Sequence, residues 1–179
     1  MLRKSFGRFF CVAGGLLALD QVLSYIVDSS LRPGESVVLI PGFASISYVR
    51  NTGAAFGILA EMRGPWASLF FVAVTALVLF IVLLVYRGLS PSRSLPLLAL
   101  PVVFGGGAGN LIDRLRYGEV IDFMDLYVNG YHWPAFNLAD ASISVGVGLL
   151  LLDMLRGRPP KQAGGGLEGE GNRTKALPS

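Results

Sequence analysis

The sequence predicts a mainly α-helical, polytopic membrane protein with four transmembrane helices and a small β-sheet outside the membrane. Only 15% of the 179 residues are charged and 53% are hydrophobic, whereas a soluble domain has about a quarter charged residues. Four apolar segments approach the ~20 residues that a helix needs to cross a bilayer. Between the first two, apolar and polar residues alternate with a period near two, which is typical of strands. The predicted spans are residues 9–27, 65–86, 95–112 and 138–155.

Residues 9–27 form the first predicted span. Basic residues precede this run, as they do in a cleavable signal peptide. However, the run is longer than the apolar core of a signal peptide, and no small-residue cleavage motif closes it. We therefore expect a retained transmembrane helix. Asp20 lies midway along it, where an unpaired charge is costly, so we expect a buried hydrogen-bonding residue that shares one network with Gln21.

Residues 28–65 differ from the spans on either side of them. Runs at 37–40 and 43–49 flank a Pro-Gly pair, which predicts a β-hairpin. The segment that follows, residues 51–57, is small and polar. We expect this region to lie at the membrane surface, because an open sheet edge cannot face lipid.

The second and third spans are predicted from different features. Residues 65–86 contain no charge and begin with Pro65, a favoured residue of the first helical turn. Residues 95–112 contain a glycine-rich run at 105–110. This run lacks the Gly-Lys-Ser/Thr of a phosphate loop and the third glycine of a dinucleotide site. We interpret it as a packing surface, since small residues let helices approach closely in lipid.

Residues 113–136 are predicted to form a second extramembrane segment, because they are rich in turn residues and aromatics. Asn137 follows this segment and is expected to cap the last helix, residues 138–155. Asp140 lies three positions after Asn137, which is the spacing of a capping box. Asp140 therefore has a structural interpretation as a helix cap beside any chemical one.

The basic residues indicate the orientation of the chain, because ten of the 15 lie on one side of the predicted membrane. Cytoplasmic loops carry the excess of Lys and Arg, so both termini are predicted to be cytoplasmic. Residues 157–179 are rich in glycine and polar residues and cannot bury a core. We predict a disordered cytoplasmic tail after a single domain, residues 1–156. The ten residues are Arg3, Lys4, Arg8, Arg87, Arg93, Arg156, Arg158, Lys161, Arg173 and Lys175.

Asp122 and Asp140 are the candidate catalytic residues. Each lies beside apolar sequence. A carboxylate near hydrocarbon is costly, so its presence there indicates a functional role. Burial and a second carboxylate both raise the pKa of a carboxyl group, so two facing carboxyls share one proton at neutral pH. The ionised group can take a proton from water while the protonated group binds the carbonyl under attack, which is general acid–base hydrolysis of an amide. The single histidine and single cysteine exclude paired-histidine zinc motifs and intrachain disulfides.

Alternative interpretations of these residues are open at this point. Asp140 can be only a helix cap, and Asp122 can pair with Arg114 or Arg116. Asp113 is expected to pair with Arg116 or with a helix end. A non-enzymatic membrane protein is another alternative, such as a small transporter or an assembly factor that keeps an inactive fold, although transporters place ionisable groups near the bilayer midplane. A presenilin-like intramembrane protease is a further one, but its Gly-x-Gly-Asp signature is absent.

Five motifs in this order and spacing closely resemble the lipoprotein signal peptidase family, also called signal peptidase II. The resemblance covers roughly residues 10–155. The chain departs from the family at Ser24, where the family usually has a lysine after Asp-Gln-x-x, so any contact made by that lysine is absent. The motifs are residues 20–21 (Asp-Gln), 51–57 (Asn-Thr-Gly-Ala-Ala-Phe-Gly), 109–114 (Gly-Asn-Leu-Ile-Asp-Arg), 120–123 (Val-Ile-Asp-Phe) and 136–140 (Phe-Asn-Leu-Ala-Asp).

The resemblance implies an aspartyl endopeptidase of the bacterial inner membrane, with the small sheet on the periplasmic side. Such enzymes remove the signal peptide from diacylglyceryl-modified prolipoproteins, on the N-terminal side of the lipidated cysteine, and Asp122 and Asp140 match their catalytic dyad. It further implies no metal and no cofactor, inhibition by globomycin and contact with membrane lipids. We expect a monomer that binds no nucleic acid. The residues expected to bind substrate or support the site are Asn51, Gly53, Asn110, Arg114, Asn137, Ala139 and Asp20.

Overall fold

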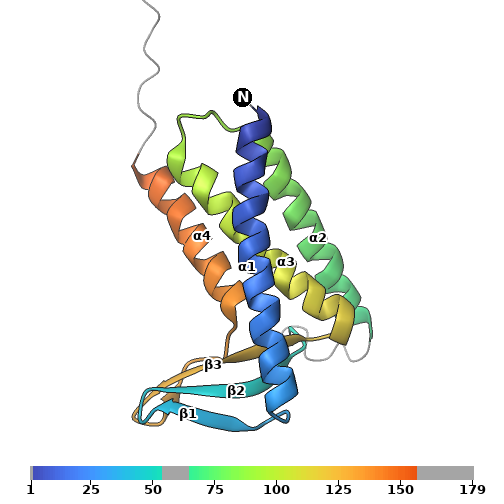
Figure 1. Ribbon diagram of the computed structural model, residues 1–179, viewed down its shortest axis with the longest axis vertical. Coiled ribbons are helices and arrows are strands. Elements are labelled where there is room, and N and C mark those ends of the chain that lie inside the picture. Colours follow the sequence, from blue (N-terminus) through green and yellow to red (C-terminus); the bar gives the residue numbers. More distant parts are fainter. Residues whose placement is uncertain (1, 54–64, 157–179) are drawn as a thin grey trace, which may run out of the picture.

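The computed structural model describes residues 2–53 and 65–156. In these residues, four helices form a bundle, and a four-stranded antiparallel sheet lies at one end of it (Figure 1). The start of α1 and the end of α4 lie at the opposite end (Figure 1). The helices are α1 (Leu2–Ser30), α2 (Pro65–Arg87), α3 (Ser94–Tyr117) and α4 (Leu138–Leu155). The strands are β1 (Ser36–Ile40), β2 (Ala44–Asn51), β3 (Val120–Val128) and β4 (Tyr131–His132).

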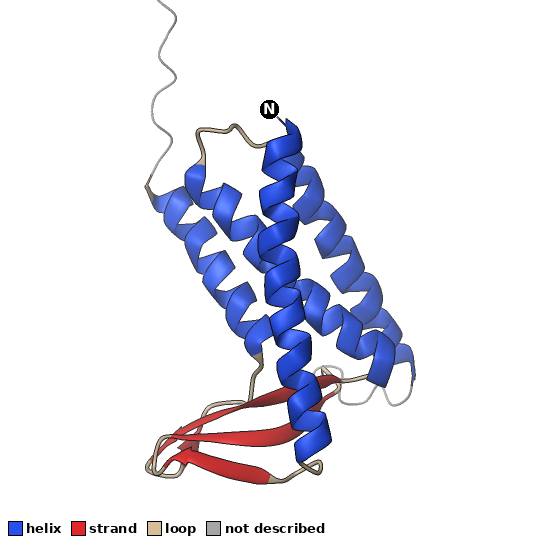
Figure 2. Cartoon of the chain, viewed as in Figure 1, coloured by secondary structure: helices blue, strands red, loops and turns tan. Residues whose placement is uncertain are grey.

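The predicted fold class is confirmed, since all four helices are long and apolar enough to cross a membrane and the sheet is separate from them (Figure 2). Two helices are longer than the spans predicted for them, since α1 covers Leu2–Ser30 instead of residues 9–27. The third helix does not end at Ile112 but continues to Tyr117, so that Asp113 and Arg114 are helical. Gly118 ends it with a φ of 77°, and its N–H bonds to the Arg114 carbonyl. Glycine adopts this left-handed conformation without strain, so Gly118 is suited to form the C-cap.

Helix α3 is the centre of the bundle. Of the 18 most apolar consecutive residues of α3, 56% are buried inside the molecule, whereas the same share for α2 is 11%. Most of the surface of α2 is therefore available to lipid. The glycine-rich run lets α3 approach two neighbours closely. A Cβ at Gly106 would collide with the Ala139 carbonyl oxygen of α4, and one at Gly109 would collide with the Asp20 carboxylate of α1. The interpretation of this run as a packing surface is thus confirmed.

The predicted hairpin is present as β1 and β2, joined by a turn in which Gly42 has a φ of 78°. Strand β3 was not predicted. It pairs antiparallel with β2, with Val49 opposite Asp122 and Asn51 opposite Val120. This pairing places Asp122 beside the end of β2. The predicted tail at 157–179 and residues 54–57 of the small polar segment lie outside the described residues.

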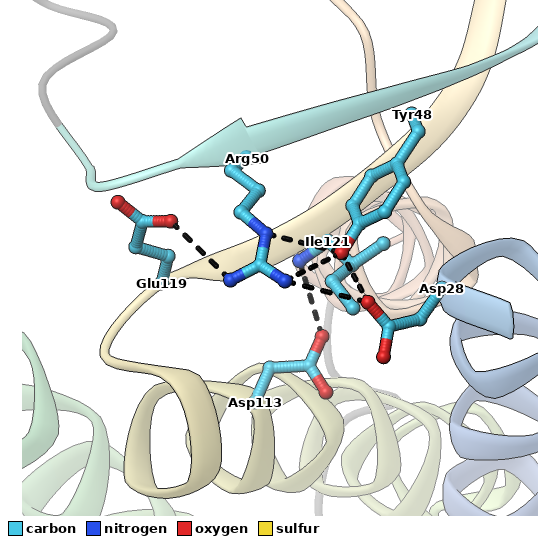
Figure 3. A network of polar contacts seen from close by, with 6 residues as sticks. All are labelled: Asp28, Tyr48, Arg50, Asp113, Glu119 and Ile121. Atoms are coloured by element: carbon cyan, nitrogen blue, oxygen red, sulfur yellow. Dashed lines mark hydrogen bonds and ion pairs between the residues drawn. The ribbon is translucent and has the colours of Figure 1, made fainter. Parts of the chain in front are cut away.

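A polar cluster fastens the sheet to the helices (Figure 3). The Tyr48 hydroxyl donates to Asp28 near the end of α1, and Arg50 Nε donates to that hydroxyl at 3.0 Å. Arg50 also forms ion pairs with Asp28 at 3.3 Å and with Glu119 at 3.9 Å. Burial and the bond to Asp28 raise the pKa of Tyr48, which keeps its hydroxyl protonated. The cluster therefore joins α1, β2 and the turn before β3, and it fixes the strand end that carries Asn51.

Candidate active site

Strand β3 carries Asp122 into the junction between sheet and bundle, where its side chain is only 1% exposed. Each carboxyl oxygen accepts one hydrogen bond, Oδ2 from Asn51 Nδ2 at 2.9 Å and Oδ1 from Asn137 Nδ2 at 3.1 Å. Burial raises the pKa of Asp122 to about 7, because the bond from Asn51 only partly opposes the burial and the charge of Asp140 adds to it. Asp122 can thus gain or lose a proton near neutral pH.

Asp140 lies in the first turn of α4, and its position follows from the helix cap. The Asn137 Oδ1 accepts from the Asp140 N–H at 2.8 Å, and Asp140 Oδ2 accepts from the Asn137 N–H at 3.5 Å. This is the capping box that the spacing predicted. The remaining oxygen, Oδ1, accepts from Asn110 Nδ2 at 2.8 Å. Asp140 is therefore a capping residue that also has an oxygen engaged with α3.

Two asparagines link the two aspartates into one hydrogen-bonded chain. Asn137 Nδ2 donates to Asp122 and to Asn110 Oδ1 at 3.0 Å, and Asn110 Nδ2 donates to Asp140. Asn137 is fully buried and Asn110 nearly so. The structure thus brings Asp122 and Asp140 to one site, held by amides that carry no charge. The alternative pairing of Asp122 with Arg116 is not adopted.

Arg114 lies one helical turn beyond Asn110 on α3. Its Nη1 donates to the Asn110 carbonyl at 3.3 Å, and its guanidinium lies 5.3 Å from the centre of the Phe71 ring. Its Nε is buried and has no hydrogen-bond partner within residues 2–53 and 65–156. The charge of Arg114 also lowers the pKa of Asp122, in opposition to burial. The positive charge of Arg114 therefore acts electrostatically on Asp122 and Asp140, while its Nε–H donor is unused within the described residues.

Gly53 supports the same region from the end of β2. Its N–H donates to Asn51 Oδ1 at 2.8 Å, which orients the Asn51 amide toward Asp122. Its φ of 88° favours glycine, and a Cβ at this position would collide with the Phe71 ring unless the ring shifted. Sequence reasoning did not single out Phe71, since one phenylalanine among the many of an apolar helix has no distinguishing pattern.

Asp20 and Ala139 lie behind the two aspartates. Asp20 Oδ1 accepts from the Ala139 N–H at 2.9 Å, and Gln21 shares this network. Asp113 was predicted to pair with Arg116 or with a helix end, and the partner Arg116 is wrong. Instead, the buried Asp113 carboxylate accepts from Gln21 Nε2 at 2.8 Å and from the Ile121 N–H at 3.2 Å.

Ser24, at the position where the family has a lysine, is 2% exposed. Its hydroxyl has no hydrogen-bond partner in the described part of the chain. No group of three His, Cys, Asp or Glu residues within residues 2–53 and 65–156 has the arrangement of a metal site.

The model of the signal peptidase (SPase) II family matches residues 12–156. This chain belongs to the signal peptidase II family. Lipoprotein signal peptidases of Geobacter metallireducens and Moorella thermoacetica are 43% and 44% identical to it over 157 residues each. These alignments cover 87% and 85% of this chain and 94% and 99% of the relatives. The chain is thus a multi-pass bacterial membrane protein of a peptidase family.

Solved structures agree with this assignment. A bacterial membrane enzyme of known structure is 35% identical and superimposes with a TM-score of 0.75, covering 84% of this chain and 94% of the other. A second has 34% identity and a TM-score of 0.74. The chain therefore shares its fold with bacterial membrane enzymes over most of its length.

Proposed function

We propose that this signal peptidase II is an aspartic endopeptidase that removes the signal peptide from diacylglyceryl-modified prolipoproteins, cutting on the N-terminal side of the lipidated cysteine. The observation that carries the proposal is the chain of amides that holds the buried Asp122 and Asp140 at the junction of bundle and sheet. The relatives named lipoprotein signal peptidase support the choice of substrate.

The proposed reaction uses one proton shared by the pair. Because burial raises the pKa of Asp122 to about 7, Asp122 can carry this proton near neutral pH. The ionised carboxylate takes a proton from water as the water oxygen attacks the scissile carbonyl carbon. The neutral carboxyl gives its proton to the carbonyl oxygen. Collapse of the resulting gem-diol passes a proton to the leaving nitrogen, breaks the C–N bond and restores the starting pair.

The asparagines have two tasks in this scheme. They hold both carboxyl groups in place, because Asn51 and Asn137 donate to the two oxygens of Asp122 and Asn110 donates to Asp140. They also leave each of these oxygens a second lone pair that can accept from water or substrate. Arg114 adds positive charge near both carboxylates. It compensates part of the negative charge of the pair without binding either aspartate directly.

A pocket of about 490 Å³ between α2 and α3 suits the lipid part of the substrate. Apart from Arg114 its walls are mostly apolar, and α2 faces the bilayer. A lipid-modified segment can therefore enter sideways, with an acyl chain in the pocket and its peptide beside the pair. The lining residues are Trp66, Ser68, Leu69, Val72, Arg114, Leu115 and Gly118.

The proposed location is the bacterial inner membrane, with both termini cytoplasmic and the active site near the periplasmic face. The excess of basic residues at the ends and in the loop before α3 supports this orientation. The sheet, whose strand β3 carries Asp122, lies at the end of the bundle opposite to the N-terminus (Figure 1). We propose a monomer that works among membrane lipids and binds globomycin at the same site.

A gel-shift assay with lipidated and unlipidated precursors tests the proposal. We expect the purified protein to cleave only the lipidated precursor and globomycin to stop the cleavage. Asp122→Asn and Asp140→Asn should each abolish cleavage while the protein stays folded and inserted. Asp153→Asn is the matched control, because Asp153 pairs with Arg93 in the half of α4 distant from the site. Cleavage of both precursors, or of neither, would contradict the proposed substrate.

A further inference from the structure

A second pair of buried carboxylates lies behind the first. Asp20 on α1 and Asp113 on α3 are each only 1% exposed. The proposed reaction uses neither of them. A buried carboxylate is retained only where its hydrogen bonds are satisfied, so their partners indicate what these two residues do.

Each carboxylate binds the backbone N–H of the residue that precedes one member of the proposed catalytic pair. Asp113 Oδ2 accepts from the N–H of Ile121, the residue before Asp122, at 3.2 Å. Asp20 Oδ1 accepts from the N–H of Ala139, the residue before Asp140, at 2.9 Å. The same relation thus occurs twice, once on a strand and once on a helix.

Gln21 joins the two carboxylates. Its Nε2 donates to Asp113 Oδ1 at 2.8 Å and lies 3.4 Å from Asp20 Oδ2. The same nitrogen also lies 3.4 Å from the carbonyl of Gly109, where any Cβ would collide with Asp20. One side-chain amide on α1 therefore sits between the carboxylate that holds β3 and the carboxylate that holds α4.

These contacts are placed where ordinary secondary structure leaves backbone groups without partners. The N–H of Ala139 belongs to the first turn of α4, which has no intrahelical acceptor. Asn137 caps the N–H of Asp140, and Asp20 caps the neighbouring N–H from another helix. The two backbone groups of Ile121 face the bundle, since its N–H binds Asp113 and its carbonyl accepts from Asn137 Nδ2 at 3.3 Å.

We propose that Asp20, Gln21 and Asp113 are positioning residues that fix the placement of Asp122 relative to Asp140. This inference rests on the proposed function, because it assigns the dyad to those two aspartates. A catalytic group must be held within about 0.5 Å of its productive position, and the contacts of Gln21, Asp20 and Asp113 join the segments that carry the two aspartates. The two carboxylates thereby couple strand β3 to helix α4 through α1.

Steady-state kinetics on the full-length protein test the positioning role. Gln21→Leu keeps the approximate size of the side chain and removes the shared donor. Asp113→Asn keeps an oxygen that can accept from the Ile121 N–H but places an NH2 group against the NH2 group of Gln21, so the bond between these two side chains is lost. Since a displacement of about 1 Å can cost about 100-fold in rate, we expect kcat to fall at least tenfold while KM for the lipidated precursor changes less than twofold. The pH–rate profile of each variant should also shift, because the spacing of the pair changes.

The control is again Asp153→Asn, which removes an α3–α4 contact without touching the network. It should lower the thermal midpoint but leave kcat and the pH profile unchanged. If Gln21→Leu and Asp113→Asn behave like this control, the residues only stabilise the fold and the inference is overturned.

An NMR measurement separates this inference from the proposed function. In the 15N spectrum of the protein in micelles, Asp113→Asn should move the amide signal of Ile121, and Asp20→Asn that of Ala139. Gln21→Leu should move both signals. Unchanged signals would overturn the positioning network even in an active enzyme, whereas shifted signals in an enzyme whose Asp122→Asn variant still cleaves would overturn only the proposed function.

Discussion

Replacing Asp122 with Asn tests whether burial controls the protonation of the site. Burial is the largest cause that raises the pKa of Asp122 from 3.8 to about 7. A carboxyl group with a raised pKa keeps its proton in the folded state at pH values where the unfolded chain has released it. Its contribution to the free energy of unfolding is complete below about pH 4 and is lost as the pH rises through about 7. A rise of about three pKa units corresponds to about 4 kcal/mol.

The Asp122→Asn variant avoids this loss because it has no charge to bury. Its NH2 group faces one of the two asparagine donors, so it loses a hydrogen bond of about 1 kcal/mol. We therefore expect it to exceed the wild type by about 3 kcal/mol at pH 8, or about 6–12 °C in Tm for a chain of this size, and to have no advantage at pH 4. Thermal unfolding in micelles measures both. An equal advantage at the two pH values, or none at pH 8, refutes the reasoning.

Three other substitutions test single contacts. Asn137→Ala removes the α4 cap and the bond to Asp122. Calorimetry should show a loss of about 1 kcal/mol in the free energy of unfolding, and cleavage assays should show a large fall in kcat. A fully active variant would contradict the role of this bond. Asn51→Ala removes a bond that lowers the pKa of Asp122, so the corresponding limb of the pH–rate profile should move to higher pH, not lower. Gly106→Ala forces a Cβ against α4 and should cost about 1–3 kcal/mol, whereas Gly148→Ala, which meets nothing within 4 Å, should not lower the Tm.

Much of the fold follows from local pattern, and the main exception is strand β3. The apolar runs predicted the four helices, and the alternation around a Pro-Gly turn predicted β1 and β2. In β3 the acidic residues Asp122 and Asp125 interrupt the alternation, because Asp122 faces a buried site instead of solvent. The turn Asn129-Gly130 was the signal that could have revealed this strand. Both residues have positive φ, 52° and 81°, as a two-residue hairpin requires.

The sequence motifs indicated the part of the candidate site in which side chains bind other side chains. The motif asparagines do bind the two aspartates, although their pattern of donation needed the structure. The contacts of Asp20 and Asp113 could not be predicted, because their partners are backbone N–H groups on distant elements. Any residue type has such a group, so no sequence pattern marks Ile121 or Ala139 as a partner.

The most direct test of the central claim compares Asp122→Asn, Asp140→Asn and the double variant in one cleavage assay on a lipidated precursor. If the two carboxyls act as one acid–base pair, each single variant loses nearly all turnover and the double variant loses no more than either single one, since groups that act as a unit are not additive. Losses that multiply in the double variant, or a single variant that cleaves at nearly the wild-type rate, contradict the claim.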